Sequence, residues 1–159
     1  MAGTFTQIYL HIIIVVKKRE NLIPKDNRQE LFEYMAGIIR NKGQKPLIVN
    51  GVGNHVHVFL GLKPEMRISD LVRDIKNNST NFINKMNWTR RKFSWQPGYA
   101  AFSYAESQVE AVYNYIINQE AHHKKKTFHE EYIEFLEKFK VEYNEKYLFE
   151  WIEDDLSEK

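Results

Sequence analysis

The chain has 159 residues, of which 43% are hydrophobic and 14% aromatic, enough to form one domain with a hydrophobic core. It contains no cysteine, which excludes disulfide frameworks, thiol catalysis and cysteine-ligated metal sites. Its longest apolar run, residues 12–16, is too short to cross a membrane, and the N-terminus lacks the pattern of a signal peptide. We therefore expect a soluble cytoplasmic protein that has no membrane partner.

The net charge of +2 conceals a basic body followed by an acidic end. Residues 130–159 carry a net charge of −7, which leaves +9 on residues 1–129. A basic body is typical of proteins that bind a phosphate-rich partner, although ordinary solubilising charge is the simpler explanation when charge is considered alone. We expect a domain over residues 1–143 and an acidic tail or helix over residues 144–159.

Hydrophobic periodicity predicts strands and helices over the first two thirds of the chain. The even positions from Ile8 to Val16 are apolar and the odd positions are mixed, which favours a central strand that is buried on both faces. The predicted elements are a strand over residues 5–16, a helix ending near residue 41, strands over 46–52 and 54–62, a long helix over 68–86 and a strand within 92–104. This β-α-β-β-α-β order predicts an α+β fold with a ferredoxin-like antiparallel sheet.

Further helices are predicted after the sheet. Ser107 and Glu110 match the S-x-x-E capping box, which indicates that a helix begins at Ser107. Tyr113 falls on the apolar stripe of this helix, so we interpret it as a structural residue. The members of the stripe are Val109, Val112, Tyr113, Ile116 and Ile117. A last helix is expected over residues 129–142.

Two histidines lie in the third predicted strand, as His55-Val56-His57. Residues two apart on a strand point to the same side, so both imidazoles leave one face of the sheet, close enough to bind one metal ion. Val56 and Val58 would then face the core. An isolated H-x-H is short and common by chance, and two histidines on a half-polar sheet face are the simpler explanation of this motif alone.

Tyr115 and Gln119 lie four residues apart on the predicted tyrosine helix, so their side chains are neighbours on a face away from the apolar stripe. His122 would extend this row if the helix continued. Tyr115 is thus the tyrosine that is free to face a site, whereas a surface aromatic is the simpler explanation in isolation.

Basic and aromatic residues are interleaved after the second long helix, and further lysines follow the tyrosine helix. Binders of single-stranded nucleic acid pair cationic grooves for the backbone with aromatic faces for unstacked bases. The candidate DNA contacts are Arg73, Lys76, Arg90, Arg91, Lys92, Lys124 and Lys125. The interleaved aromatic residues are Trp88, Trp95, Tyr99 and Phe102. Taken singly, most of these residues fit a core position or a solvated surface.

Three segments together resemble the single-tyrosine HUH transposases, the TnpA-type enzymes of the smallest insertion sequences and their REP-associated relatives. The histidine strand of that family resembles residues 54–62, NHVHVFLGL. Its tyrosine-helix block resembles residues 95–132, WQPGYAAFSYAESQVEAVYNYIINQEAHHKKKTFHEEY, and its first strand resembles residues 9–19, YLHIIIVVKKR. The resemblance covers about residues 5–135. The chain departs from it at residues 17–19, Lys-Lys-Arg, where many members carry a Tyr-Arg pair.

The resemblance implies a transposase that cleaves and rejoins single-stranded DNA through a 5′-phosphotyrosine intermediate, for excision and insertion of a small mobile element. His55, His57 and Gln119 would be ligands of a divalent ion, Mg²⁺ or Mn²⁺, and Tyr115 would be the nucleophile. His11 matches a family position, to which we assign no role. The resemblance also implies hairpin DNA targets and a homodimer, in which the tyrosine helix can act on the partner's site.

Two other functions remain open at this point. A domesticated transposase would bind hairpin single-stranded DNA without cleaving it and would ignore metal. A zinc hydrolase would use His55, His57 and His122 as ligands and water as the nucleophile. The basic surface fits the first, and the three histidines fit the second.

Overall fold

The computed structural model describes residues 3–144, without the side chains of residues 122 and 123. The expected acidic tail, residues 144–159, lies outside the described residues apart from its first position. Within the part of the chain that is described, no helix is both long enough and apolar enough to cross a membrane.

Four antiparallel strands form one sheet in the order β2-β3-β1-β4. The strands are β1 (Tyr9–Val15), β2 (Lys45–Val52), β3 (His55–Gly61) and β4 (Ala100–Tyr104). The helices are α1 (Arg28–Asn41), α2 (Ile68–Lys85), α3 (Val109–Ile117), α4 (Gln119–His123) and α5 (Phe128–Lys138). Because α1 joins β1 to β2 and α2 joins β3 to β4, the first six elements form the expected ferredoxin-like α+β arrangement, to which α3, α4 and α5 are added.

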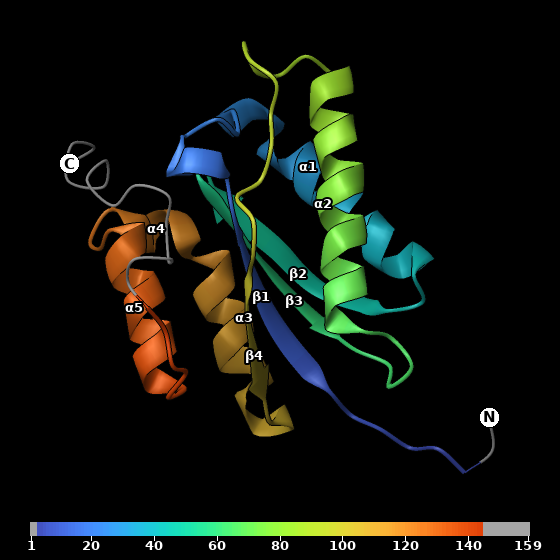
Figure 1. Ribbon diagram of the computed structural model, residues 1–159. Coiled ribbons are helices and arrows are strands. Elements are labelled where there is room, and N and C mark those ends of the chain that lie inside the picture. The colour runs from blue at the N-terminus through green and yellow to red at the C-terminus, as the bar shows by residue number, and fades with distance from the viewer. Residues whose placement is uncertain (1–2, 145–159) are drawn as a thin grey trace.

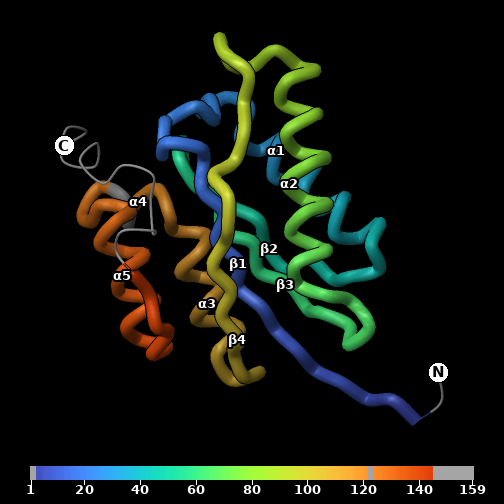
Figure 2. The backbone as a smooth tube through the Cα atoms, viewed as in Figure 1, coloured from blue at the N-terminus to red at the C-terminus, as the bar shows by residue number. Residues whose placement is uncertain are grey.

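The sheet is the middle one of three layers (Figure 1). Helices α1 and α2 cover one face, and α3, α4 and α5 cover the other; the backbone trace shows the same separation (Figure 2). The side chains of β1 alternate between the two cores. Leu10, Ile12 and Ile14 pack beneath α1 and α2, whereas Ile13 and Val15 pack against α5. The prediction of a central strand buried on both faces is therefore confirmed.

The strand β1 is shorter than expected, since it begins at Tyr9 rather than Phe5. Tyr9 pairs with Gly61 and Tyr104, which are the last residues of the two neighbouring strands. The residues before Tyr9 have no strand on either side, so they leave the sheet (Figure 2), and the Phe5 side chain is 92% exposed.

The start of α3 also differs from the expectation. This helix begins at Val109, after a single 3₁₀ turn, rather than at Ser107. The side-chain oxygen of Gln108 accepts the Ala105 N–H at 3.0 Å and so satisfies a backbone donor at this turn. This contact takes the place of the expected capping box between Ser107 and Glu110.

The apolar stripe of α3 is narrower than the periodicity predicts. Val112 and Ile116 are buried against Phe59, as expected. Tyr113 and Ile117 are 38% and 51% exposed, so their assignment to the core is wrong. Tyr113 and Ile117 each follow a buried residue by one position, so they lie about 100° around the helix from the face that packs on Phe59.

The last helix, α5, begins at Phe128, one residue before the expected start at residue 129. The Thr127 hydroxyl accepts the Glu130 N–H at 3.1 Å, which satisfies one of the donors left over at a helix start. Tyr132 and Leu136 are buried as expected. The helix ends at Lys138 rather than at residue 142, and Lys140 takes a left-handed backbone conformation with φ of 55°.

Candidate active site

The two histidines of β3 point from the sheet toward α3, α4 and α5. Val56 and Val58 lie in the opposite core, as the strand periodicity predicts. The side chains of His55 and His57 are both 0% exposed. They are therefore interior residues rather than members of a half-polar surface.

The hairpin between β2 and β3 fixes the backbone at His55. Gly51 faces Val56 across this hairpin. A Cβ atom at Gly51 would lie 2.3 Å from the His55 carbonyl oxygen, so a side chain there would displace the strand that carries the histidines. Gly51 thus has a direct role in placing His55.

Each histidine is held through its Nδ1 atom. His55 Nδ1 donates to Asn54 Oδ1 at 2.7 Å. His57 Nδ1 lies 2.6 Å from His11 Nε2, which reaches across from β1. Because both Nδ1 atoms are engaged, the two Nε2 atoms are directed at Gln119 and Glu131.

The Glu131 carboxylate lies at the centre of the cluster. It comes from α5 and is only 4% exposed. Its Oε1 atom is 3.3 Å from His57 Nε2 and 3.4 Å from His55 Nε2. Its Oε2 atom accepts hydrogen bonds from the Tyr115 hydroxyl and from Gln119 Nε2, the latter at 3.3 Å.

Tyr115 and Gln119 reach this cluster from two different helices. Tyr115 belongs to α3 and Gln119 begins α4, with a break in the helix at Asn118 between them. Gln119 is buried, and its Oε1 atom lies 3.3 Å from His55 Nε2. The structure therefore brings together the four residues that sequence selects, although not on one continuous helix. The side chain of His122 lies outside the described residues.

Burial and the carboxylate shift the pKa values in the cluster. Burial lowers the pKa of His57, and burial with the nearby His57 lowers the pKa of His11, which keeps these imidazoles neutral. Burial alone would raise the pKa of Glu131, but its contacts with the imidazoles of His55 and His57 outweigh burial and hold that pKa below its usual range. Burial, followed by the Glu131 charge, raises the pKa of Tyr115. The tyrosine is thus a protonated phenol beside a carboxylate.

This donor set fits a divalent cation. One ligand atom from each of His55, His57 and Glu131 lies within 4.8 Å of the other two. Neutral imidazole nitrogens and carboxylate oxygens are common ligands of divalent ions, and an amide oxygen such as that of Gln119 is a suitable hard ligand. The hydrogen bonds at both Nδ1 atoms are of the kind that orients histidine ligands.

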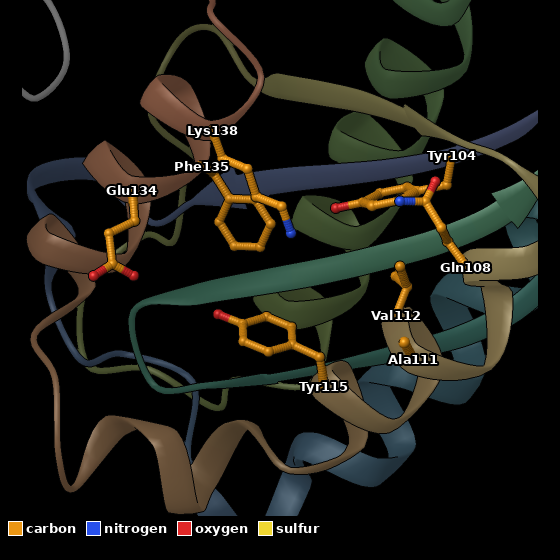
Figure 3. A pocket seen from close by; sticks show the side chains of 8 residues that line it. All are labelled: Tyr104, Gln108, Ala111, Val112, Tyr115, Glu134, Phe135 and Lys138. Carbon is orange, nitrogen blue, oxygen red and sulfur yellow. The ribbon is translucent and has the colours of Figure 1, made fainter.

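A cavity of about 260 Å³ opens beside the tyrosine, between α3 and α5 (Figure 3). Its aromatic lining comes from Tyr104, Tyr115 and Phe135, and polar groups come from Gln108 and Lys138. The side chains of Tyr115 and Phe135 point toward one another across it, with ring centroids 5.6 Å apart. The cavity thus reaches the phenol ring, whereas the histidines have no exposed surface.

Sequence reasoning missed Glu131, which appears in the chain as one of many acids near the C-terminus. A signal does exist in its spacing. Glu131 lies three residues after Phe128 and four before Phe135, on the side of α5 that packs against the sheet. A carboxylate on a buried stripe is uncommon unless it has a partner, so its position could have indicated a site.

The seven basic residues selected as DNA contacts lie on both sides of the sheet. Arg73 and Lys76 belong to α2, on the face opposite the tyrosine, and residues 90–92 follow that helix. Lys124 and Lys125 follow α4, in the layer that contains the tyrosine helix (Figure 1). Both lysines are exposed.

Three of these cations have partners within the protein. Arg73 lies 3.3 Å from Asp70, and Arg91 lies 2.8 Å from Glu20. Lys76 donates to two backbone carbonyl oxygens, and burial lowers its pKa.

The interleaved aromatic residues divide between core and surface. Trp95 and Phe102 are buried, and the Trp95 ring N–H donates to Ser79 Oγ at 2.9 Å. Trp88 packs at the edge of the core beneath α2, whereas Tyr99 is 40% exposed. Most of these rings therefore have a structural role.

Comparison with known proteins gives three similarities. Residues 4–119 match the family described as "Transposase IS200 like". The ISDra2 transposase TnpA of Deinococcus radiodurans is 23% identical over 122 residues, which cover 74% of this chain and 87% of that protein. A solved structure of a candidate transposase from Deinococcus radiodurans R1 superposes with a TM-score of 0.60 at 21% identity, covering 75% of this chain and 95% of that one.

A second solved structure, a REP-associated tyrosine transposase bound to a REP hairpin, superposes with a TM-score of 0.55 at 14% identity. The match covers 74% of this chain and 70% of that one. At these identities the two structural similarities establish the fold.

Proposed function

The chain belongs to the family of IS200-like transposases, and from this membership we propose that it cleaves and rejoins single-stranded DNA through a covalent 5′-phosphotyrosine intermediate. The observation that carries the proposal is the position of the Tyr115 hydroxyl, which shares the Glu131 carboxylate with the paired histidines of β3. The proposed nucleophile and the proposed metal ligands thus lie in one cluster, which supports the proposal. The reaction would serve excision and insertion of a small mobile element.

His55, His57 and Gln119 are the proposed holders of a divalent ion, Mg²⁺ or Mn²⁺. The Nε2 atoms of the histidines and the Gln119 Oε1 atom face one another in the cluster, which supports this assignment. Such an ion supplies positive charge that favours the phenolate and offsets the charge that develops on a phosphate in the transition state.

Tyr115 would attack the phosphorus atom in line with the leaving group. The bond from the Tyr115 oxygen to phosphorus forms, the bond from phosphorus to the 3′ oxygen breaks, and the strand leaves with a free 3′-hydroxyl. A free phenol has a pKa of about 10. Because burial and Glu131 raise the pKa of Tyr115 further, the phenol depends on positive charge in the site to lose its proton. The covalent link preserves the phosphodiester, so a 3′-hydroxyl can attack it and rejoin strands without ATP.

The proposed DNA partner is a single strand with hairpin ends, which the hairpin bound by the REP-associated structural relative supports by analogy. The proposed contacts are Arg73, Lys76, Arg90, Arg91, Lys92, Lys124 and Lys125.

One tyrosine per chain provides one cleavage, so excision at two ends calls for a homodimer, with the tyrosine helix acting in the same subunit or in its partner. The domain would span residues 1–143, and the protein would act in the cytoplasm.

A denaturing-gel assay tests this function. Labelled single-stranded DNA with the hairpins that flank the gene is incubated with the full chain and Mg²⁺ or Mn²⁺, beside the Tyr115→Phe variant. A metal-dependent protein–DNA adduct that is lost in Tyr115→Phe, while DNA binding persists, is the expected result. Binding of the flanking DNA by the native chain without an adduct in either metal would contradict cleavage and favour a non-catalytic hairpin binder.

A further inference from the structure

We propose that Glu131, contributed by α5, is the anionic ligand of the divalent ion in this chain. The inference rests on the proposed function, because it concerns the same ion as His55, His57 and Gln119. It adds a residue that lies beyond residues 4–119, the segment that matches the transposase family. It also assigns a function to the helix α5, which follows the ferredoxin-like sheet.

The distances around the carboxylate support coordination better than hydrogen bonding. Glu131 Oε1 is 3.3 Å from His57 Nε2 and 3.4 Å from His55 Nε2. Hydrogen bonds from N–H to oxygen usually span about 2.9–3.0 Å. Atoms that each lie about 2.1 Å from a common ion are about 3.0–3.4 Å from their neighbours in octahedral or tetrahedral shells. The observed separations fall at the upper end of that range.

The third neighbour has the same spacing. Gln119 Oε1 lies 3.3 Å from His55 Nε2. The two imidazole nitrogens and the two oxygens, from Gln119 and Glu131, therefore form a four-donor set with nearly equal contacts. Two of the four donors are oxygens, which suits the hard ions Mg²⁺ and Mn²⁺.

Charge gives an independent reason. Two neutral imidazoles and one amide carry no charge, so these three ligands alone would leave a buried divalent ion uncompensated. Glu131 is 4% exposed, and among the described residues its polar contacts are with His55, His57, Gln119 and Tyr115, none of which is a permanent cation. Burial of an ionised carboxylate is unfavourable unless it is paired with positive charge or binds a metal. A cation bound at Oε1 would compensate the charge of the buried carboxylate, and the carboxylate would compensate part of the charge of the ion.

The second carboxylate oxygen connects the ion site to the nucleophile. Glu131 Oε2 accepts the Tyr115 hydroxyl, so the carboxylate that would bind the ion through one oxygen orients the phenol through the other. In a different role, the carboxylate would occupy the place of the scissile phosphate and block it. Removal of its charge would then speed cleavage, whereas removal of a metal ligand would slow it. The experiment below separates the two.

The proposal is tested by measuring the binding of Mn²⁺ alone to the full chain. Titration calorimetry and the electron paramagnetic resonance signal of free Mn²⁺ both give the Kd. Glu131→Gln keeps the size of the side chain and removes its charge. Glu130→Gln is the matched control, since Glu130 is the adjacent, exposed residue on the same helix. We expect Glu131→Gln to raise the Kd for Mn²⁺ at least tenfold, Glu130→Gln to leave it unchanged, and Glu131→Asp to fall between Glu131→Gln and the native chain.

His57→Ala separates failure of this inference from failure of the proposed metal site. If His57→Ala loses Mn²⁺ binding while Glu131→Gln binds with the native Kd, Glu131 is not a ligand and the histidine site stands. If His57→Ala itself binds Mn²⁺ normally, the histidine site is wrong. Native Mn²⁺ binding together with faster cleavage by Glu131→Gln would identify a blocking carboxylate and overturn the proposal. Melting curves in a chelator verify that each variant is folded. If Glu131→Gln is not folded, Glu131→Asp replaces it as the test variant.

Discussion

His11 Nε2 lies 2.6 Å from His57 Nδ1, so a residue of β1 supports a histidine of β3 across the middle of the sheet. The two rings are stacked, with centroids 4.9 Å apart, and both are 0% exposed. Among the described residues, the other ring nitrogen of His11 has no hydrogen-bond partner. The polar contact of His11 is therefore with His57, and we expect His11 to orient this proposed metal ligand, a role that the sequence does not reveal.

Replacement of His11 by phenylalanine tests that role. His11→Phe keeps an aromatic ring beside Phe102 and Phe135 but removes the contact with His57 Nδ1. Loss of such a supporting contact lowers metal affinity by about 10–100-fold. We expect this loss in Mn²⁺ titrations, without a fall in melting temperature in a chelator, since an unpaired buried nitrogen is also removed. Tyr9→Phe, on the same face of β1, is the control that should bind normally; equal affinity in both variants would contradict the role.

The two tyrosines of α3 should differ sharply in their effect on cleavage. Tyr115 donates to Glu131 within the site, whereas Tyr113 is 38% exposed. Tyr113→Phe is expected to retain the full yield of DNA adduct, and Tyr115→Phe to lose it by at least three orders of magnitude, because the nucleophilic oxygen is absent. Adduct yield is measured on denaturing gels with equal DNA and Mn²⁺. An adduct that is lost in Tyr113→Phe instead would reassign the nucleophile.

Strand periodicity predicted the part of the site that depends on β3, because alternate residues must face opposite sides of a sheet. It separates His55 and His57 from Val58 without any tertiary information. Helix periodicity was less reliable in α3, where Tyr113 is exposed although the pattern places it inside. The break at Asn118 was also not visible in the spacing of the site residues.

The spacing of Glu131 places it on a buried helix stripe but does not identify its partners. Its position depends on how α5 packs against the face of the sheet that carries the histidines, and no local pattern specifies that packing. The sequence shows an acid three residues after Phe128 and next to another acid, Glu130, which is consistent with either a solvated helix face or a buried carboxylate. Only the fold brings it within reach of His57 and Tyr115.

Binding of a divalent ion should stabilise the folded chain. An ion that binds the native state alone adds about 2.7 kcal/mol when its concentration is 100 times the Kd. For a domain of this size that corresponds to a rise in melting temperature of about 5–10 °C. We expect such a rise with Mn²⁺ in scanning fluorimetry, its reversal by a chelator, and its absence in His57→Ala. A similar rise in His57→Ala would mean that the ion binds elsewhere.

The two glycines Gly51 and Gly37 offer a matched test of the hairpin that places His55. Gly51→Ala would put a Cβ atom 2.3 Å from the His55 carbonyl oxygen, whereas Gly37, within α1, has no atom within 4 Å of the corresponding position. We expect Gly51→Ala to lower the free energy of unfolding by about 1–3 kcal/mol through backbone displacement. Gly37→Ala should raise it by about 0.5–1 kcal/mol through helix propensity. Urea unfolding measures both, and equal stability of the two variants would contradict a constrained hairpin.

The basic residues that lie on opposite sides of the sheet should contribute unequally to DNA binding. Lys124 and Lys125 are exposed in the layer that contains Tyr115, whereas Arg73 projects from α2 on the other face and contacts Asp70. Each contact with a phosphate of single-stranded DNA contributes about 0.7 to the slope of log affinity against log salt concentration. The Lys124→Ala/Lys125→Ala double variant should therefore reduce that slope by about 1.4 if both lysines contact phosphates.

Arg73→Ala is the comparison for the lysine pair. As a single cation that is already paired with Asp70, Arg73 should contribute less than the pair, so we expect its replacement to reduce the salt slope by at most about 0.7. Fluorescence anisotropy with a labelled hairpin strand at several salt concentrations gives the slope and the affinity. Tyr115→Phe is used as the background, so that cleavage does not deplete the DNA during the titration. A larger effect from Arg73→Ala than from the lysine pair would place the bound strand across α2, on the far side of the sheet from the nucleophile, which would require the strand to pass around the sheet edge to reach Tyr115.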